Sequence, residues 1–314
     1  MTSVATLAAS ASRTASVEDY FALLKPRVMS LVVFTGLAGM LVAPVRLDPL
    51  TAFTALLCIA VGAGASGALN MAYDSDIDAL MTRTAGRPIP MGRIARGDAL
   101  GFGWTLAAGA VALMWLFVNP IAASLLGFSI GFYVFVYTLW LKRRTTQNIV
   151  IGGLAGALPP AIGWAAATNG LALAPLVLVL IVFLWTPPHF WALSLYRSDD
   201  YARAGVPMLP VVRGKRATRR QIFLYAIALV PLGVVPALIG LAGPLYAVVA
   251  LGFGGWFAMD AWAVLREHDE TREPAARRLF GVSILYLFAL FAALVVEHVS
   301  GMPALPLHVL GGWA

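Results

Sequence analysis

Two carboxylates and an amide recur every four residues at the end of an apolar stretch, at Asn70, Asp74 and Asp78. If the preceding helix continues through them, this spacing places all three on one helical face. Carboxylate and amide oxygens suit a hard cation such as Mg²⁺, which often shares its shell with substrate phosphates. Arg83 and Arg87 follow, and guanidinium groups grip phosphate by paired hydrogen bonds. The stretch therefore predicts a metal and diphosphate site.

A plainer interpretation of the same cluster is a solvated acidic helix end that neutralises the nearby arginines. Asp76 fits that interpretation, because it lies about 200° from Asp74 around the helix. We therefore expect Asp76 on the surface, outside any metal site.

A second acidic pair, Asp199 and Asp200, follows a later apolar stretch. Acidic residues have no part in setting membrane topology, which favours a second metal contact here. The segment Ala85-Gly86-Arg87-Pro88 near the first cluster is echoed by Ala204-Gly205-Val206-Pro207 near the second. The echo suggests a weak internal repeat, with the two acidic loops facing each other across one cavity.

Two further polar residues lie within or beside apolar sequence. His189 would lie about 12 Å deep if its segment is helical. It is either a hydrogen-bonded histidine among aromatic residues or a substrate contact or base. Lys25 directly precedes an apolar stretch, where a snorkelling anchor and a diphosphate contact are both compatible with the sequence.

Membrane helices must position these residues. The chain is 60% hydrophobic and only 12% charged, which excludes an ordinary soluble domain. The single cysteine excludes a disulfide framework and a thiolate metal site. Nine apolar segments are each long enough to cross ~30 Å of hydrocarbon: 28–45, 51–73, 99–118, 121–141, 148–167, 172–194, 221–240, 244–265 and 280–299.

Positive charge is confined to one side of these segments. Of the 22 Lys and Arg residues, all but Arg46 fall in the amino-terminal tail or in the loops after even-numbered segments. The positive-inside rule then places these loops and the amino terminus in the cytoplasm, and the carboxyl terminus outside. Topology also explains the net charge of +7 without a nucleic-acid partner.

The sequence thus predicts an all-α membrane domain over residues 20–314, after a disordered cytoplasmic tail over residues 1–19. The tail lacks the pattern of a secretory or transit signal, so we expect a bacterial inner membrane. The pairs Pro159-Pro160 and Pro187-Pro188 should break or kink their helices, and such helices often line a cavity.

With these residues assembled, the chain resembles the UbiA superfamily of intramembrane prenyltransferases over nearly its whole length. The elements Pro188-His189-Phe190-Trp191 and Asp200-Tyr201 resemble the branch that farnesylates haem. The other motifs are N-x-x-x-D-x-x-x-D from Asn70 to Asp78, Arg83-Thr84, Arg87-Pro88, the segment 147–153, and the segment 204–210.

The resemblance implies nine helices around a central cavity and a cytoplasmic active site. It implies farnesyl transfer from farnesyl diphosphate to a vinyl group of haem B, with addition of water, giving haem O for terminal oxidases. A haem A synthase would be the downstream partner. The implied roles are Mg²⁺ binding by Asn70, Asp74, Asp78 and Asp200, diphosphate neutralisation by Arg83, Arg87 and Lys25, and haem positioning by His189.

Two positions depart from the superfamily pattern. Many members carry an acid directly after the first Asn, where this chain has Met71. Their second motif is usually D-x-x-x-D, whereas Arg203 and Ala204 follow Asp200 here, which leaves the share of Asp199 in metal binding open. Two alternatives also stay open: a UbiA enzyme that prenylates an aromatic or quinone precursor, and a transporter with ion-binding acidic loops.

Overall fold

The computed structural model describes residues 15–305, whose regular elements are all helices. In chain order they are α1 (Val17–Leu23), α2 (Pro26–Leu41), α3 (Pro49–Tyr73), α4 (Ser75–Leu80), α5 (Arg96–Phe117), α6 (Pro120–Gly131), the π-helix η1 (Phe132–Leu141), α7 (Asn148–Ala157), α8 (Pro159–Thr168), α9 (Leu173–Tyr196), α10 (Ser198–Arg203), α11 (Leu209–Leu238), α12 (Pro244–Leu265) and α13 (Pro274–Val299).

Within the described residues, eight helical spans are long and apolar enough to cross a membrane. The helices α1 and α2, bent by 52° against each other, form a ninth if they are taken as one span. Two of the eight are composite, because α6 continues into η1 and α7 into α8. The all-α architecture and the expected count are confirmed.

The two proline pairs have different effects. The helix breaks at Leu158, directly before Pro159, as predicted. By contrast, α9 runs through Pro187 and Pro188 as one helix, so of the two predicted outcomes, a break or a kink, the break does not occur there. A proline ring is compatible with helical φ, and packing in the protein interior can hold a helix that has lost backbone hydrogen bonds.

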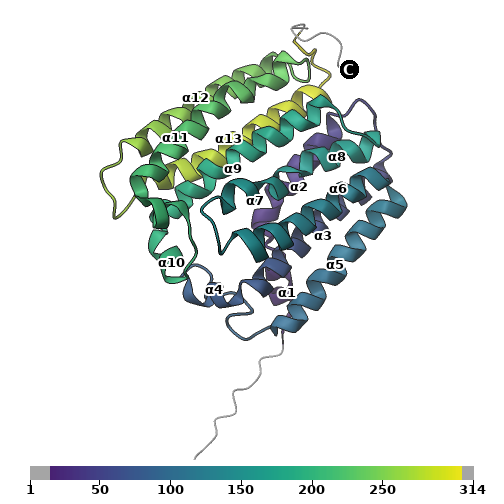
Figure 1. Cartoon of the computed structure of the whole chain (residues 1–314). Coiled ribbons are helices and arrows are strands. Elements are labelled where there is room, and N and C mark those ends of the chain that lie inside the picture. The colour runs from purple at the N-terminus through teal and green to yellow at the C-terminus, as the bar shows by residue number, and fades with distance from the viewer. Residues whose placement is uncertain (1–14, 306–314) are drawn as a thin grey trace, which may run out of the picture.

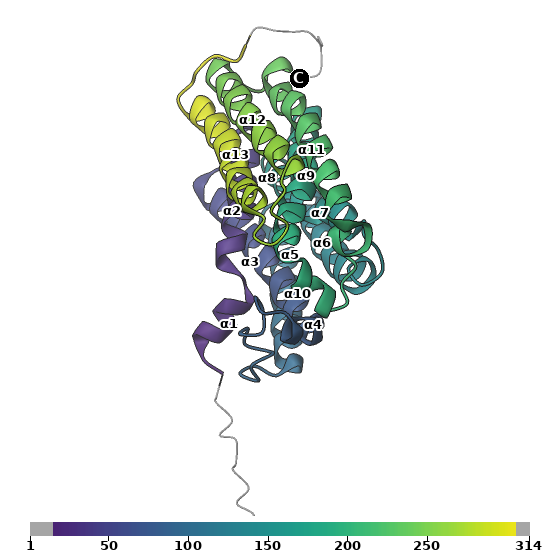
Figure 2. The same cartoon turned by 90° about the vertical axis from the view of Figure 1, so that its left-hand side faces the viewer.

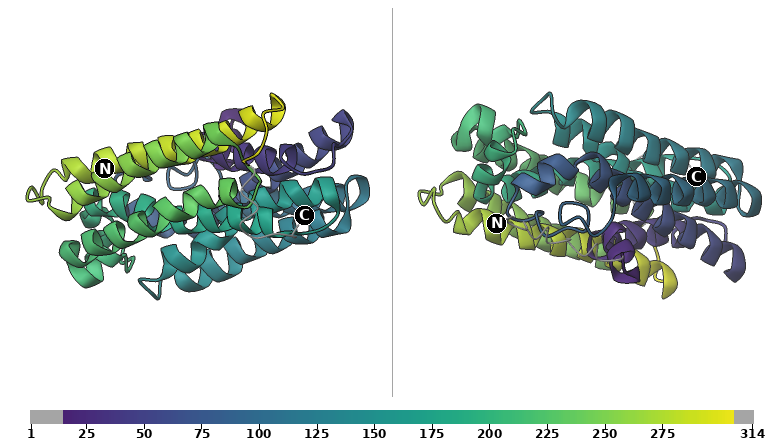
Figure 3. Two further views of the ribbon diagram at one scale, coloured as in Figure 1. Left: turned by 90° about the horizontal axis from the view of Figure 1, so that it is seen from above. Right: turned by 90° about the horizontal axis from the view of Figure 1, so that it is seen from below.

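The helices form an elongated bundle. The short helices α1, α4 and α10 lie at one end of it, and the α11–α12 turn lies at the other (Figures 1 and 2). Seen from either end, the carboxyl-terminal half, green to yellow, occupies one side, and the purple to blue amino-terminal half occupies the other (Figure 3). Both acidic loops therefore lie at the same end of the bundle.

Glycines bring α2 and α8 into backbone contact near the break at Leu158. A Cβ added to Gly39 would collide with the Pro160 carbonyl oxygen, and one added to Gly163 would collide with the Gly36 carbonyl oxygen. Small residues allow this close approach of membrane helices. The first span is thereby held against the middle of the bundle.

The predicted tail ends earlier than expected. Residues 1–14 lie outside the described part of the chain, and Val17 to Asp19 already form the first turn of α1. A capping box starts this helix, with Ser16 and Asp19 each accepting a hydrogen bond from the other's backbone N–H. Arg93 also donates to Asp19 at 2.7 Å. The boundary at residue 19 therefore falls inside a helix.

Candidate functional site

The first acidic cluster lies at a break in the helix, not on one continuous helix as expected. α3 ends at Tyr73, and Asp74 has φ −97° and ψ 11° before α4 begins. Helical hydrogen bonds nevertheless cross the break, from Asp74 N to Asn70 O at 2.9 Å and from Asp78 N to Asp74 O at 2.8 Å. The one-turn spacing of the three side chains therefore survives.

Asp74 is fully buried in a polar cluster whose members come from three spans. Asn70 Nδ2 donates to Asp74 Oδ2 at 2.7 Å and to Thr138 Oγ1 at 3.2 Å. Lys25 Nζ donates to Asn70 Oδ1 at 2.7 Å. Lys142 forms a short ion pair with the same Asp74 oxygen. The structure thus joins Lys25 to the cluster, a role that sequence spacing did not separate from membrane anchoring.

The π-helix η1 delivers Thr138 and Lys142 to this cluster. Its wider turn is seen where Lys142 N bonds Tyr137 O, five residues back, at 2.9 Å. The Thr138 hydroxyl donates to Tyr133 O at 2.9 Å, again five residues back. These contacts orient both residues toward α3, and π-helical turns often occur at functional sites.

Asp78 forms a separate ion pair on the next turn. Arg87 donates to Asp78 Oδ2 at 2.6 Å, and the Asp78 side chain is almost fully buried. The Thr84 hydroxyl bonds the Asp78 carbonyl at 3.0 Å and so fixes the turn that leads to Arg87. Arg83 lies exposed between them. The two arginines predicted for the site thus differ: one is committed to a carboxylate, and the other is open to solvent.

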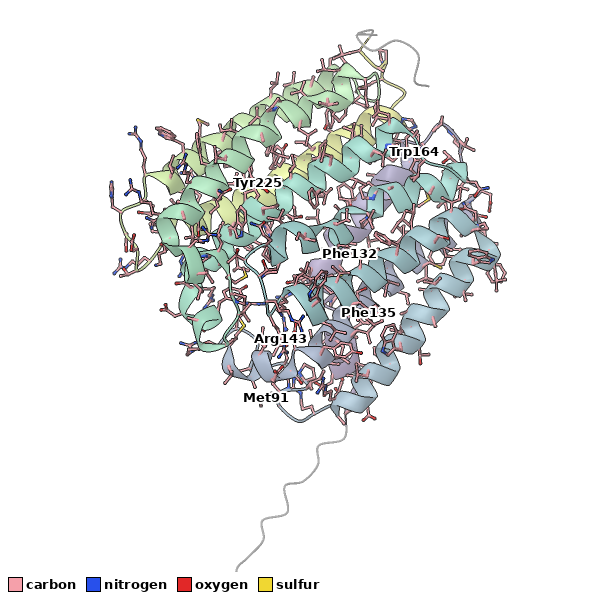
Figure 4. The ribbon with its side chains drawn as sticks, in the orientation of Figure 1. Met91, Phe132, Phe135, Arg143, Trp164 and Tyr225 are labelled. Carbon is pink, nitrogen blue, oxygen red and sulfur yellow. The ribbon has the colours of Figure 1, made fainter. Side chains whose placement is uncertain are left out.

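Asp76 lies on the surface, as its position around the helix predicts. Its side chain is 63% exposed and accepts two hydrogen bonds from Arg143, each 2.7 Å long. Arg143 also donates to the Tyr73 carbonyl, and Figure 4 shows it beside α4. The hydrogen bond from Arg143 lowers the pKa of Asp76 to about 2. Asp76 is therefore a charged surface residue paired outside the buried cluster.

The second acidic loop meets the first through a contact that we call the loop clasp, made of Thr82, Asp200 and Arg203. Buried Asp200 accepts from the Thr82 hydroxyl at 2.9 Å and from the Thr82 backbone N–H at 3.4 Å. Arg203 pairs with Asp200 and donates to the Thr82 hydroxyl at 2.9 Å. Asp199 is exposed and takes no part in this contact. The two loops are therefore in direct contact, and Arg203 lies at this contact.

A small pocket opens beside the clasp. Its volume is about 140 Å³, smaller than the ~300–1,000 Å³ typical of a ligand site. It is lined from both loops and from the segment after η1, by Asp76, Ile77, Leu80, Arg143, Ala204 and Gly205. The pocket thus lies where residues of the two loops come together.

The donor atoms of the two loops fit a hard cation. Within residues 15–305, no three acidic, histidine or cysteine side chains already converge as a metal cage. Among the acidic side chains of the two loops, two buried oxygens nevertheless lack a hydrogen-bond partner, Asp74 Oδ1 and Asp200 Oδ2. Their nearest cationic groups are Arg143 at 3.7 Å and Arg197 at 3.9 Å. Unsatisfied buried oxygens are uncommon, and carboxylate oxygen is the ligand that Mg²⁺ prefers.

His189 lies apart from these charges, inside α9. Its ring stacks between Trp185, at a centroid distance of 4.3 Å, and Phe280 of α13, at 4.5 Å. Its Nδ1 lies 2.6 Å from the Ser283 hydroxyl. The ring of His189 is therefore hydrogen-bonded among aromatic residues, and its orientation is fixed. A ring held in this way can also contact a substrate, so the two interpretations of the sequence are compatible.

Comparison with known proteins identifies the family. Residues 32–285 match the UbiA prenyltransferase family. The chain belongs to this family. A relative from Parvibaculum lavamentivorans named Protoheme IX farnesyltransferase is 60% identical over 290 residues, covering 91% of each chain. One of the same name from Nitrobacter hamburgensis is 61% identical over 284 residues, covering 90% of this chain and 91% of the relative.

Solved structures share the UbiA fold. One from work on digeranylgeranylglyceryl phosphate synthase has a TM-score of 0.74 at 18% identity, covering 90% of this chain and 99% of its own. A UbiA homolog from Archaeoglobus fulgidus, bound to DMAPP and Mg²⁺, has a TM-score of 0.69 at 16% identity, covering 88% and 99%. At such identities the likeness carries the fold and not the activity.

Sequence reasoning missed three hydroxyl residues of this UbiA prenyltransferase. Thr82, Thr138 and Ser283 each bond a predicted site residue. A single hydroxyl in a loop or apolar helix gives no spacing signal, and its partner is set only by packing. The family match includes all three but begins after Lys25.

Proposed function

We propose that this protein transfers the farnesyl group of farnesyl diphosphate to a vinyl group of haem B and adds water, giving haem O. The proposal rests on sequence identity to relatives named Protoheme IX farnesyltransferase. Two of them are 60% and 61% identical to this chain, over 91% and 90% of its length. An acidic, cation-lined end and a separate aromatic histidine site supply groups suited to a charged donor and a flat apolar acceptor.

The donor belongs at the acidic loops. Asn70, Asp74, Asp78 and Asp200 would hold Mg²⁺, with Asp199 peripheral because it is exposed. Bound Mg²⁺ supplies positive charge that stabilises the leaving diphosphate. Arg83, Arg87 and Lys25 would share that task, and Lys142 joins them because it already reaches Asp74.

Chemistry then proceeds by ionisation. The allylic C–O bond of farnesyl diphosphate breaks, and its electron pair leaves with the diphosphate. A vinyl carbon of haem B attacks the farnesyl cation, water adds to the cation left on the side chain, and one proton is released. Apolar surroundings keep bulk water from quenching the farnesyl cation first.

The acceptor belongs beside His189. The stacked rings of Trp185 and Phe280 hold the imidazole in one orientation, so that it can hold or orient the haem. Under this proposal the charged site at the end of α3 and the apolar site within α9 lie on different helices of one bundle.

Location follows from the charge distribution along the chain. The basic loops, which include both acidic clusters, would face the cytoplasm of a bacterial inner membrane, and a haem A synthase would take the product. Cysteines introduced one at a time at the two ends of the bundle, in protein whose buried Cys58 is replaced by Ala, test this orientation. Arg144→Cys should react with a membrane-impermeant thiol reagent only from the cytoplasmic side, and Arg46→Cys only from outside.

Product analysis tests the activity. Membranes containing the protein, haem B, farnesyl diphosphate and Mg²⁺ should form a later-eluting haem whose mass has grown by one farnesyl group and one hydroxyl group. Asp74→Asn in equally folded protein serves as the inactive control. An unchanged haem peak from verified folded protein contradicts the proposal, and prenylation of an added aromatic or quinone precursor instead would favour that alternative.

A further inference from the structure

A chain of hydrogen bonds leads from α13 to His189. Ser283 is fully buried, and its hydroxyl donates to the Phe280 carbonyl, three residues back on the same helix, at 2.7 Å. The Trp185 indole N–H donates to the Ser283 carbonyl at 2.7 Å and ties this part of α13 to α9. The position of the Ser283 oxygen is therefore fixed from both helices.

This arrangement determines which histidine nitrogen carries the proton. A serine hydroxyl has one proton to donate and two lone pairs. Because the Ser283 proton is directed to the Phe280 carbonyl, its oxygen can only accept from His189, whose Nδ1 lies 2.6 Å away. The neutral imidazole thus carries its proton on Nδ1, and its lone pair lies on Nε2.

The packing fixes the ring of His189 and leaves Nε2 without a hydrogen bond to the described residues. Trp185 and Phe280 stack on the ring at interplanar angles of 19° and 22°, Phe190 meets it edge-on at a centroid distance of 5.3 Å, and the Ser283 hydroxyl lies at Nδ1. The residue as a whole keeps 8% exposure. Within residues 15–305, Nε2 forms no hydrogen bond, so its lone pair has no protein partner there.

We propose that Ser283 is a positioning residue that presents the Nε2 lone pair of His189 to the iron of haem B. The inference rests on the proposed function and adds to it the ligating atom and the residue that sets it. Imidazole is a common axial ligand of haem iron. A hydrogen bond from the ring nitrogen that does not bind the metal fixes the tautomer, orients the ring and raises the basicity of the ligating nitrogen.

Spectroscopic titration of the purified full-length protein with ferric haem B tests this role without farnesyl diphosphate. Ser283→Ala should weaken haem affinity by about 10- to 100-fold and shift the absorption and electron paramagnetic resonance signature of the axial imidazole. Ser283→Thr, which keeps the hydroxyl, should stay near the wild type. His189→Ala should lose the imidazole signature altogether.

Ser194→Ala is the matched control. Ser194 is also fully buried, and its hydroxyl also donates three residues back, to the Trp191 carbonyl at 2.9 Å. A general packing defect would alter both serine variants, whereas the proposed role predicts a spectral change only in Ser283→Ala.

The outcomes separate this inference from the proposed function. If wild-type protein makes haem O but Ser283→Ala or His189→Ala keeps the wild-type haem spectrum, the positioning role is wrong and the activity stands. If the spectra change as expected but no haem O forms, the positioning role stands and the activity is wrong. A wild-type protein that binds no haem B contradicts both.

Discussion

The acidic loops and the His189 site hold their functional groups by opposite means. At the loops, each buried carboxylate pairs with a basic side chain: Lys142 on Asp74, Arg87 on Asp78 and Arg203 on Asp200. At His189, two aromatic rings and one hydroxyl hold a neutral imidazole. The first arrangement relies on charge balance, and the second relies on shape.

The difference shows where rearrangement must accompany binding. A metal and a diphosphate bring charges of both signs to the loops, so the existing ion pairs must be shared or exchanged. The imidazole has no charged partner to release, and its ring is already oriented by packing. Substitutions should therefore affect donor binding through charge and acceptor binding through geometry.

The largest effect is expected for Asp74→Asn. The change keeps the shape and removes the charge that faces Lys142, so turnover should fall on the order of 100- to 1,000-fold. Haem affinity should stay at the wild-type value, because His189 lies on another helix. Steady-state rates and a haem titration on the same preparation check both, and a loss of haem binding would mean that the two regions are not separate.

A smaller effect is expected for Lys142→Met, which leaves Asp74 buried without its cation. Breaking a buried ion pair typically costs about 3–5 kcal/mol, and the partial exposure of Lys142 moderates this, so a clear loss of thermal stability is expected. Arg144→Met is the control, since Arg144 is exposed on the same turn. Equal melting temperatures for the two variants would show that the Lys142 pair does not stabilise the fold.

The loop clasp should matter less. Arg203 is 54% exposed, and exposed pairs contribute ~0.2–1 kcal/mol. Arg203→Ala should therefore loosen the clasp and raise hydrogen exchange in residues 198–208, with a change in rate of less than about fivefold. Arg213→Ala, at an exposed site, should leave exchange there unchanged; identical protection in Arg203→Ala would show that Thr82 and Asp200 hold the clasp alone.

The smallest effect is expected for Asp76→Asn. The pKa of Asp76 is about 2 in the folded protein and about 3.9 in the unfolded chain. The pair with Arg143 therefore stabilises the fold when the pH is above the unfolded pKa, and this stabilisation is lost as the pH falls toward 2. Between pH 6 and 8 the variant should match wild-type turnover. A rate loss in that range would place Asp76 in the site, contrary to its 63% exposure.

The membrane fold was predictable because hydrophobic length and charge segregation are encoded locally. The spans follow apolar runs, and the break before Pro159 follows local backbone chemistry. The unbroken passage of α9 through Pro187 was not predictable, because neighbouring helices decide whether a proline kinks a membrane helix.

The candidate site was predictable in its residues and not in its pairings. The spacing of Asn70, Asp74 and Asp78 marks one end of the bundle, yet nothing in it indicates that Lys142 and Thr138 arrive from a π-helix. A π-helical turn rotates every later side chain around the helix axis, and an apolar sequence gives no signal of such a turn. Such partners depend on packing between segments far apart in the chain.

The central claim is that donor and acceptor bind at two separate places, and a crossed binding measurement tests it most directly. The affinities for farnesyl diphosphate with Mg²⁺ and for haem B are measured on wild type, Asp74→Asn and His189→Ala. We predict that Asp74→Asn weakens only farnesyl diphosphate binding and that His189→Ala weakens only haem binding. Loss of both ligands in either folded variant, or the reverse pattern, would contradict the account.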